Sequence, residues 1–229
     1  MNDAVQQSLE CVIHETAPNP RHAVIWLHGL GADGNDFAPI VPQLRQAARR
    51  PLRFVFPHAP VRPVTINGGM AMRAWYDILG VDIARDEDTS GIADSLRRLA
   101  ALVDHEIKSG ILPEHLILAG FSQGGAIALR AGLAQRRPVA GVLALSCYLL
   151  QAERFNEWAR PESRQVPIFM GHGTQDPVVP VQLGQRSAEL LQAAGYDVEW
   201  ATWPMPHAVC PEEIQAIDHW LDRRFRQAR

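Results

Sequence analysis

The feature that most constrains this chain is an apolar run that leads directly into a serine flanked by glycines. Leu116–Gly120 is apolar, Gly120 and Gly124 bracket Ser122, and Ala126–Ala134 is rich in small residues. The apolar run predicts a buried strand, and the small-residue stretch predicts a helix. The Gly-x-Ser-x-Gly turn between them predicts a sharp strand-to-helix elbow in which the two glycines let the backbones approach. Ser122 is then held in a strained conformation at the end of the strand.

Strands and helices are predicted to alternate along the rest of the chain. Apolar residues recur with helical spacing from Ile92 to Ile107 and from Ile214 to Phe225. Strands covered on both faces and separated by helices favour a three-layer α/β domain, with a mostly parallel central sheet and helices on both faces. Because no linker, charge block or repeat divides the chain, residues 1–229 are expected to form a single domain. The predicted strands are Ala23–Leu27, Leu52–Phe56, Leu116–Gly120, Val139–Leu145, Val166–Met170 and Val198–Trp203.

Charge and hydropathy argue against two classes of partner. The 22 Lys and Arg and 25 Asp and Glu give a net charge of -3, and basic residues gather only in pairs, so no nucleic acid is expected. The longest apolar stretch, Gly141–Leu150, is far shorter than the roughly 20 residues of a membrane helix, so no stable membrane insertion is expected. Met1–Gln7 has neither the basic start nor the apolar core of a secretory signal, which predicts a cytoplasmic protein.

A serine needs a histidine to take its proton and a carboxylate to orient that histidine. Downstream of Ser122, His207 lies in a loop between the last predicted strand and the last predicted helix. His172 follows a strand directly but precedes any suitable acid, and His219 lies within a predicted helix. Asp176 follows the strand that ends at Met170, whereas the other downstream carboxylates fall on predicted helices or near a strand start. Ser122, Asp176 and His207 are therefore the predicted catalytic residues.

The glycine-rich turn after the strand Ala23–Leu27 allows two interpretations. Gly29, Gly31 and Gly34 fit the G-x-G-x-x-G pattern of a dinucleotide site, but no acidic residue follows at the end of the next strand to hold a ribose. The favoured interpretation is an oxyanion turn, in which the backbone N–H groups of Leu30 and Gln123 stabilise a developing negative charge. His28 is expected to be a buried histidine bonded to the backbone.

The spacing of cysteine and histidine indicates no metal site and no disulfide framework. Cys11, Cys147 and Cys210 are widely separated and form no C-x-x-C pair, and the histidines show neither H-x-H nor H-x-x-x-H spacing. The cysteines are expected to be reduced thiols. No cofactor and no metal are expected.

Taken together, these motifs resemble the carboxylesterase, lysophospholipase and acyl-protein thioesterase family of α/β-hydrolases. The resemblance covers nearly the whole chain and implies a hydrolase fold without a large cap domain, with the same triad and oxyanion groups. Pro206 is a departure, because relatives often have glycine before the catalytic histidine. The motifs that carry the resemblance are Leu27–Gly34, Pro57–Pro60, Val64–Gly69, Ala74–Ile78, Gly120–Gly125, Gly171–Gly173 with Asp176, and His207 with Pro211–Glu213.

The predicted function is a serine esterase that cleaves acyl esters, thioesters or lysophospholipids through an acyl-enzyme. The resemblance suggests that segment Asn67–Val81 borders an acyl groove, with Trp75, Leu79, Met72 and Val178 as candidate contacts. Two alternatives stay open: an acyltransferase that uses the same elbow, and a non-catalytic scaffold that binds an apolar ligand. The sequence is compatible with either a monomer or a homodimer, and the physiological substrate is left open.

Overall fold

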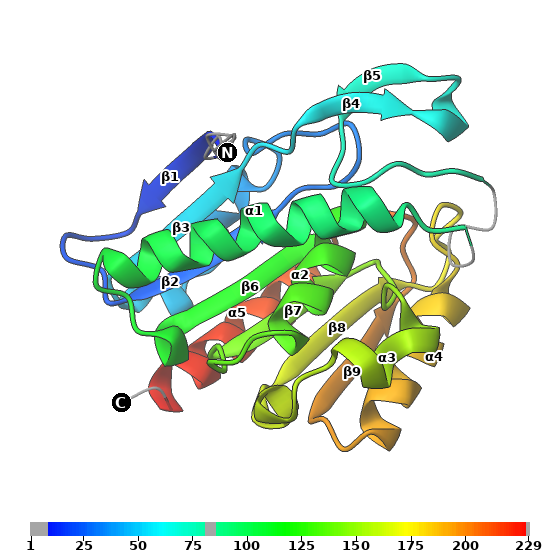
Figure 1. The fold of residues 1–229 in the computed structure, drawn as a ribbon. Helices are drawn as coiled ribbons and strands as arrows, with labels where there is room; N and C mark the ends of the chain where they lie inside the picture. The colour runs from blue at the N-terminus through cyan, green and yellow to red at the C-terminus, as the bar shows by residue number, and fades with distance from the viewer. Residues whose placement is uncertain (1–8, 81–85, 228–229) are drawn as a thin grey trace.

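A computed structural model describes residues 9–80 and 86–227, and its described part is built around a seven-stranded sheet (Figure 1). The strands lie in the spatial order β1-β3-β2-β6-β7-β8-β9. Six of them are parallel, and β1 pairs antiparallel with β3 at one edge. The strand bounds are β1 Cys11–Glu15, β2 His22–Leu27, β3 Leu52–Pro57, β6 Leu116–Phe121, β7 Gly141–Leu145, β8 Ile168–Gly173 and β9 Val198–Trp203.

Helices cover both faces of the sheet, as the alternation of elements predicts. On one face, side chains of α1, α2 and α4 share a buried cluster with β2, β6 and β7; on the other, α5 and the short 3-10 helix Ala38–Gln43 close a second cluster (Figure 1). This arrangement confirms the predicted three-layer α/β fold, and the described residues contain no large cap domain. The helix bounds are α1 Thr89–Lys108, α2 Gln123–Leu133, α3 Phe155–Trp158, α4 Val181–Ala193 and α5 Pro211–Gln227.

The strand register brings the catalytic candidates to one edge of the sheet. Leu27 at the end of β2 pairs with Gly120, Phe121 pairs with Leu145, and Gly173 pairs with Trp203. Since these strands are parallel, the turns that follow them open at the same carboxyl edge, which is where ligand sites of such sheets lie.

Five strands differ from the predictions. Strands β7 and β8 begin two residues later than predicted, at Gly141 and Ile168. Strand β1 has no apolar run because it is an edge strand whose residues are half-buried or exposed. A hairpin of β4 Val61–Val64 and β5 Met70–Arg73, which stands beyond the edge of the sheet, was not predicted, and its second strand falls within the segment Asn67–Val81 (Figure 1). Val81, at the end of that segment, and Met1–Gln7 lie outside the described residues.

Candidate active site

The predicted elbow lies between β6 and α2, with Ser122 at its apex. Ser122 has φ 55° and ψ -125°, in the region of positive φ that L-residues rarely adopt, and it is the N-cap residue of α2. A Cβ atom added to Gly120 would lie 2.4 Å from the carbonyl carbon of Gly124, and one added to Gly124 would lie 2.4 Å from the carbonyl oxygen of Leu27. Both glycines are therefore required because the backbones approach too closely for any side chain.

The acid and base candidates meet although they are far apart in the sequence. The Asp176 carboxylate is buried in the loop after β8, and its Oδ2 lies 2.6 Å from Nδ1 of His207. Its Oδ1 accepts hydrogen bonds from the backbone N–H groups of Val178 at 2.8 Å and Val179 at 2.9 Å. These bonds hold the carboxylate in one orientation. Since Nδ1 of His207 donates to Asp176, Nε2 is the ring nitrogen left to accept a proton.

Ser122 and His207 line the same cavity, which brings the three predicted catalytic residues to one site. The imidazole packs against Phe121, the neighbour of Ser122, with ring centroids 4.7 Å apart. Both residues are described, and no direct hydrogen bond joins Oγ of Ser122 to the imidazole. Catalytic hydrogen bonds are often long in unliganded enzymes and shorten when substrate binds.

The two predicted oxyanion donors flank the serine. A Cβ atom added to Gly29 would lie 3.5 Å from Cβ of Ser122, so the Gly29–Leu30 turn lies beside the nucleophile. Leu30 and Gln123 both line the cavity. Within the described residues, neither backbone N–H donates to another protein group. Both donors are therefore available to an oxygen that develops negative charge.

The side chain of Gln123 has a role that the sequence did not reveal. Its Oε1 accepts a hydrogen bond from the backbone N–H of Trp75 at 2.9 Å, and its Nε2 donates to the carbonyl of Tyr76 at 2.6 Å. The residue that supplies an oxyanion donor thus also fixes the loop 74–78 against the elbow. No sequence motif signals this contact, because the two partners are 47 residues apart.

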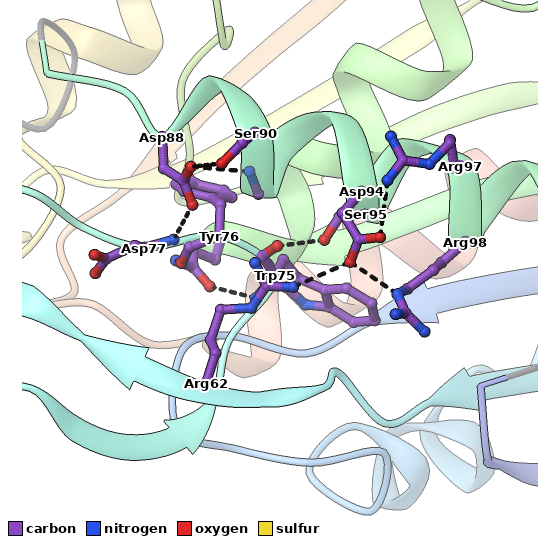
Figure 2. A network of polar contacts seen from close by, with 12 residues as sticks. Arg62, Trp75, Tyr76, Asp77, Asp88, Ser90, Asp94, Ser95, Arg97 and Arg98 are labelled. Atoms are coloured by element: carbon purple, nitrogen blue, oxygen red, sulfur yellow. Dashed lines mark hydrogen bonds and ion pairs between the residues drawn. The ribbon is translucent and has the colours of Figure 1, made fainter. Parts of the chain in front are cut away.

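The same loop is tied to the start of α1 by the polar network in Figure 2. Oδ2 of Asp88 accepts from the backbone N–H of Asp77 at 3.0 Å, while Oδ1 accepts from Gly91 at 2.9 Å and so caps the helix. Ser95, one turn into α1, donates to the carbonyl of Trp75. Loop 74–78 is therefore held from two sides, by α1 and by α2.

The cavity above Ser122 has a volume of about 410 Å³ and a mainly apolar wall. Of the predicted groove contacts, Val178 lies in this wall. Trp75, Met72 and Leu79 do not: Trp75 is fully buried and donates through Nε1 to the carbonyl of His28 at 2.8 Å. The segment Asn67–Val81 does contribute to the wall, through Asn67, Tyr76 and Ile78. The wall residues that sequence reasoning missed are Cys147, Tyr148, Val179, Ile66, Ala32 and Asp36.

Neither of the remaining downstream histidines lines the cavity, although Nε2 of His172 lies 3.5 Å from Oδ2 of Asp176. Nε2 of His172 donates to the carbonyl of Val179 at 2.9 Å, and burial lowers the pKa of this imidazole. His219 is exposed on α5 and donates through Nδ1 to the carbonyl of Gln215 at 2.7 Å. Neither histidine takes the position of a base toward Ser122, which leaves His207.

His28 is buried and bonded to the backbone, as predicted. Its Nδ1 donates to the carbonyl of Gly29 at 2.7 Å, and its Nε2 accepts from the backbone N–H of Ala59 at 3.0 Å. Burial lowers the pKa of His28. This neutral imidazole braces the turn that carries Leu30.

Two further properties of the described part of the chain concern metal binding and membrane insertion. Across residues 9–80 and 86–227, no group of three or more His, Cys, Asp or Glu side chains is arranged to hold a metal ion. No helix in those ranges has the length and apolar character needed to cross a bilayer. Cys11, Cys147 and Cys210 are free thiols.

The layered sheet, the serine elbow and the acid–histidine pair at its carboxyl edge define an α/β-hydrolase. Residues 9–224 match the phospholipase/carboxylesterase family, and the chain belongs to this family, as the resemblance predicted. It is therefore a hydrolase of carboxylic ester bonds.

Similar proteins cover most of the chain. It is 43% identical over 211 residues to acyl-protein thioesterase 1 of Gibberella zeae, a match that covers 88% of this chain and 90% of the relative. It is 36% identical over 224 residues to acyl-protein thioesterase 1 of Cryptococcus neoformans, covering 90% and 94%. The crystal structure of SOBER1 from Arabidopsis thaliana superposes with a TM-score of 0.83 at 31% identity, covering 89% of this chain and 99% of that one.

Proposed function

We propose that this hydrolase cleaves acyl esters and thioesters through a triad of Ser122, His207 and Asp176. The observation that carries the proposal is the 2.6 Å bond from His207 to a buried carboxylate beside the cavity that also contains the elbow serine. Leu30 and Gln123 supply the two oxyanion N–H groups.

The chemistry proceeds in two steps. Oγ of Ser122 attacks the acyl carbon while Nε2 of His207 takes its proton, and the oxyanion accepts hydrogen bonds from Leu30 and Gln123. The intermediate collapses, the bond to the leaving group breaks, and His207 returns the proton to the departing alcohol or thiol. Water then attacks the acyl-enzyme, with His207 as base, and releases the acid and free Ser122. The proposed route uses side chains and water alone and requires no cofactor.

Two observations support an acyl thioester as the finer substrate. The relatives at 43% and 36% identity are named acyl-protein thioesterases. The cavity wall offers apolar side chains, including Ile66, Ile78 and Val178, against which an acyl chain can pack. A series of esters and thioesters of increasing acyl length tests this assignment through kcat/KM; a faster ester at every length would contradict the thioester preference.

Transfer of the acyl group to an added alcohol, measured against hydrolysis by water, tests the acyltransferase alternative.

The triad is tested by the substitution Ser122→Ala. We expect turnover of p-nitrophenyl butyrate to fall by roughly 10⁶-fold, since the nucleophile is lost. Labelling by an organophosphorus probe, read by intact mass, should disappear. Ser109→Ala, an exposed serine at the end of α1, should keep both. Retained activity or labelling in a folded Ser122→Ala protein would remove Ser122 from its assigned role and reopen the non-catalytic alternative.

Three broader assignments stay predictions. We infer a single domain, which is supported by one sheet that draws strands from Cys11 to Trp203 and by a family match over residues 9–224. A cytoplasmic location and the choice between monomer and homodimer rest on the sequence alone.

A further inference from the structure

The wall of the catalytic cavity contains one carboxylate that the proposed mechanism does not use. Asp36 follows the glycine-rich turn that carries Leu30, and both residues line the cavity. Among the described wall residues, Asp36 is the only acid, and no lysine or arginine is present to neutralise it. No hydrogen bond or ion pair reaches its carboxylate from any described residue. The cavity therefore presents a negative charge that the protein leaves uncompensated.

Other aspartates around the site differ in this respect, because each is satisfied by the protein. Their carboxylates accept hydrogen bonds at 2.5 to 3.0 Å from neighbouring backbone or side-chain groups. They are Asp33 with Asn35, Asp77 with Thr65, Asp88 with Asp77 and Gly91, and Asp176 with His207 and Val178. Of these described aspartates, Asp36 is the one whose carboxylate accepts no hydrogen bond from the protein, and we call it an open carboxylate. Although Asp36 is exposed, partial desolvation, and next the negative charge of Asp33, raises the pKa of its carboxyl group, so a nearby cation would relieve an unfavourable charge.

The chemistry of the reaction indicates which part of a substrate would meet this charge. The acyl chain of a simple ester is uncharged and fits the apolar part of the wall, formed by side chains such as Ile66, Ile78 and Val178. A positive charge must then be carried by the alcohol or thiol that leaves. Asp36 follows the turn that carries the oxyanion donor Leu30 and lines the same cavity, so it can attract such a group within the site where the bond breaks.

We propose that Asp36 is a specificity-determining residue that favours esters and thioesters whose leaving alcohol or thiol carries a positive charge. The inference rests on the proposed hydrolase function and adds the charge of the leaving group to it. Asp36 is largely exposed, so the preference is expected to be modest, about two- to fivefold in kcat/KM. It should weaken as salt screens the interaction.

The test compares thioesters that differ only in charge. Butyrylthiocholine supplies a cationic leaving thiol, and the butyryl thioester of 3,3-dimethylbutanethiol is its neutral isostere. A third substrate has the quaternary ammonium on the acyl chain and the neutral thiol as leaving group. Each is assayed at low and at high salt with the wild type, Asp36→Asn, Asp36→Lys and the control Asp104→Asn. Asp104 is exposed on α1 outside the cavity wall, so its substitution makes the same change in net charge elsewhere.

The expected result is a cation-to-neutral ratio of about two to five in the wild type and in Asp104→Asn. The ratio should fall to about one in Asp36→Asn and below one in Asp36→Lys. An unchanged ratio in Asp36→Asn, or a preference for the cation on the acyl chain, would overturn the inference while leaving the hydrolase function intact. Loss of activity toward the neutral thioester in Asp36→Asn would also overturn it. A wild type that cleaves none of the substrates would overturn both proposals.

Discussion

At the scale of single residues, the site depends on hydrogen bonds that fix each group and leave one reactive atom available. Oδ1 of Asp176 accepts hydrogen bonds from the N–H groups of Val178 and Val179, and its Oδ2 accepts one from His207. His207 is thereby oriented through Nδ1, and Nε2 remains for proton transfer. Pro206, the departure noted in the sequence, does not prevent this geometry, because His207 still reaches the buried carboxylate at 2.6 Å.

This geometry predicts the effect of Asp176→Asn. The amide keeps an oxygen for the two backbone donors, but its NH₂ group faces Nδ1 of His207 and favours the wrong tautomer of the imidazole. We expect kcat to fall roughly 10⁴-fold with little change in thermal unfolding. Steady-state kinetics and a melting curve check this. A fall of less than tenfold would mean that Asp176 is not the orienting acid.

The side chains that line the cavity were harder to predict from the sequence than the residues of the triad. Tyr76 and Ile78 line the cavity, whereas Trp75, which directly precedes Tyr76, is buried and donates to the carbonyl of His28. Which side chains of a loop face the cavity depends on its backbone path. Here the hydrogen bonds that the loop backbone donates to Gln123 and Asp88 determine that path, and these partners lie 48 and 11 residues further along the chain.

At the scale of elements, α1 does more than cover the sheet. Its N-cap residue Asp88 also accepts from Asp77, so the start of the helix and the loop 74–78 share one carboxylate. Asp94, further along the helix, pairs with Arg98 of the same helix at 2.9 Å and with Arg62 of β4 at 3.4 Å (Figure 2). Helix α1 therefore packs on the sheet and at the same time holds loop 74–78, which lines the cavity.

The shared carboxylate predicts a coupled effect of Asp88→Ala. Loss of the cap and of the bond to Asp77 should lower the free energy of unfolding by about 1–2 kcal/mol. Because loop 74–78 carries Tyr76 and Ile78, KM for longer acyl chains should also rise. Urea unfolding and the acyl-length series measure the two effects. Asp104→Ala, an exposed position on the same helix, serves as the control and should change neither; equal KM values in both variants would contradict the coupling.

At the scale of the whole molecule, buried ionisable groups lower the free energy of unfolding both when the pH rises and when it falls. Glu213 on α5 is fully buried, neither of its carboxylate oxygens has a partner among the described residues, and burial raises its pKa from 4.5 to about 8. Between these values the unfolded chain releases the proton that the folded chain retains, so stability falls as pH rises. His28 and His172 have lowered pKa values, so stability falls as pH drops below about 6.5.

Glu213→Gln should therefore stabilise the protein at alkaline pH. The amide resembles the protonated acid, so the gain is expected to be a few kcal/mol at about pH 8 and to vanish well below the ordinary pKa of 4.5, where the carboxyl is protonated in both the folded and the unfolded wild type. Urea unfolding at several pH values checks this. Glu212→Gln, the exposed neighbour, should give no pH-dependent gain. A gain independent of pH would show that packing, rather than the proton, is responsible.

The sequence by itself determined the central sheet and the elbow. β2, β3, β6, β7 and β8 are largely buried, which requires apolar runs that are visible along the chain. β9 was also predicted, although it is an edge strand whose residues are half-buried or exposed. The elbow is equally local, because Gly120, Ser122 and Gly124 lie within five consecutive residues. Edge strand β1 and the β4–β5 hairpin leave no such pattern, since much of their surface is exposed.

Only the tertiary structure decided which residues meet. The order of elements named Asp176 and His207 as candidates, and the fold brought them to 2.6 Å at the edge where the parallel strands end. The cavity wall, the contacts of Gln123 with loop 74–78 and the open carboxylate of Asp36 depend on long-range contacts. Such contacts arise when separate segments pack together, and the periodicity of a single segment does not encode its distant partners.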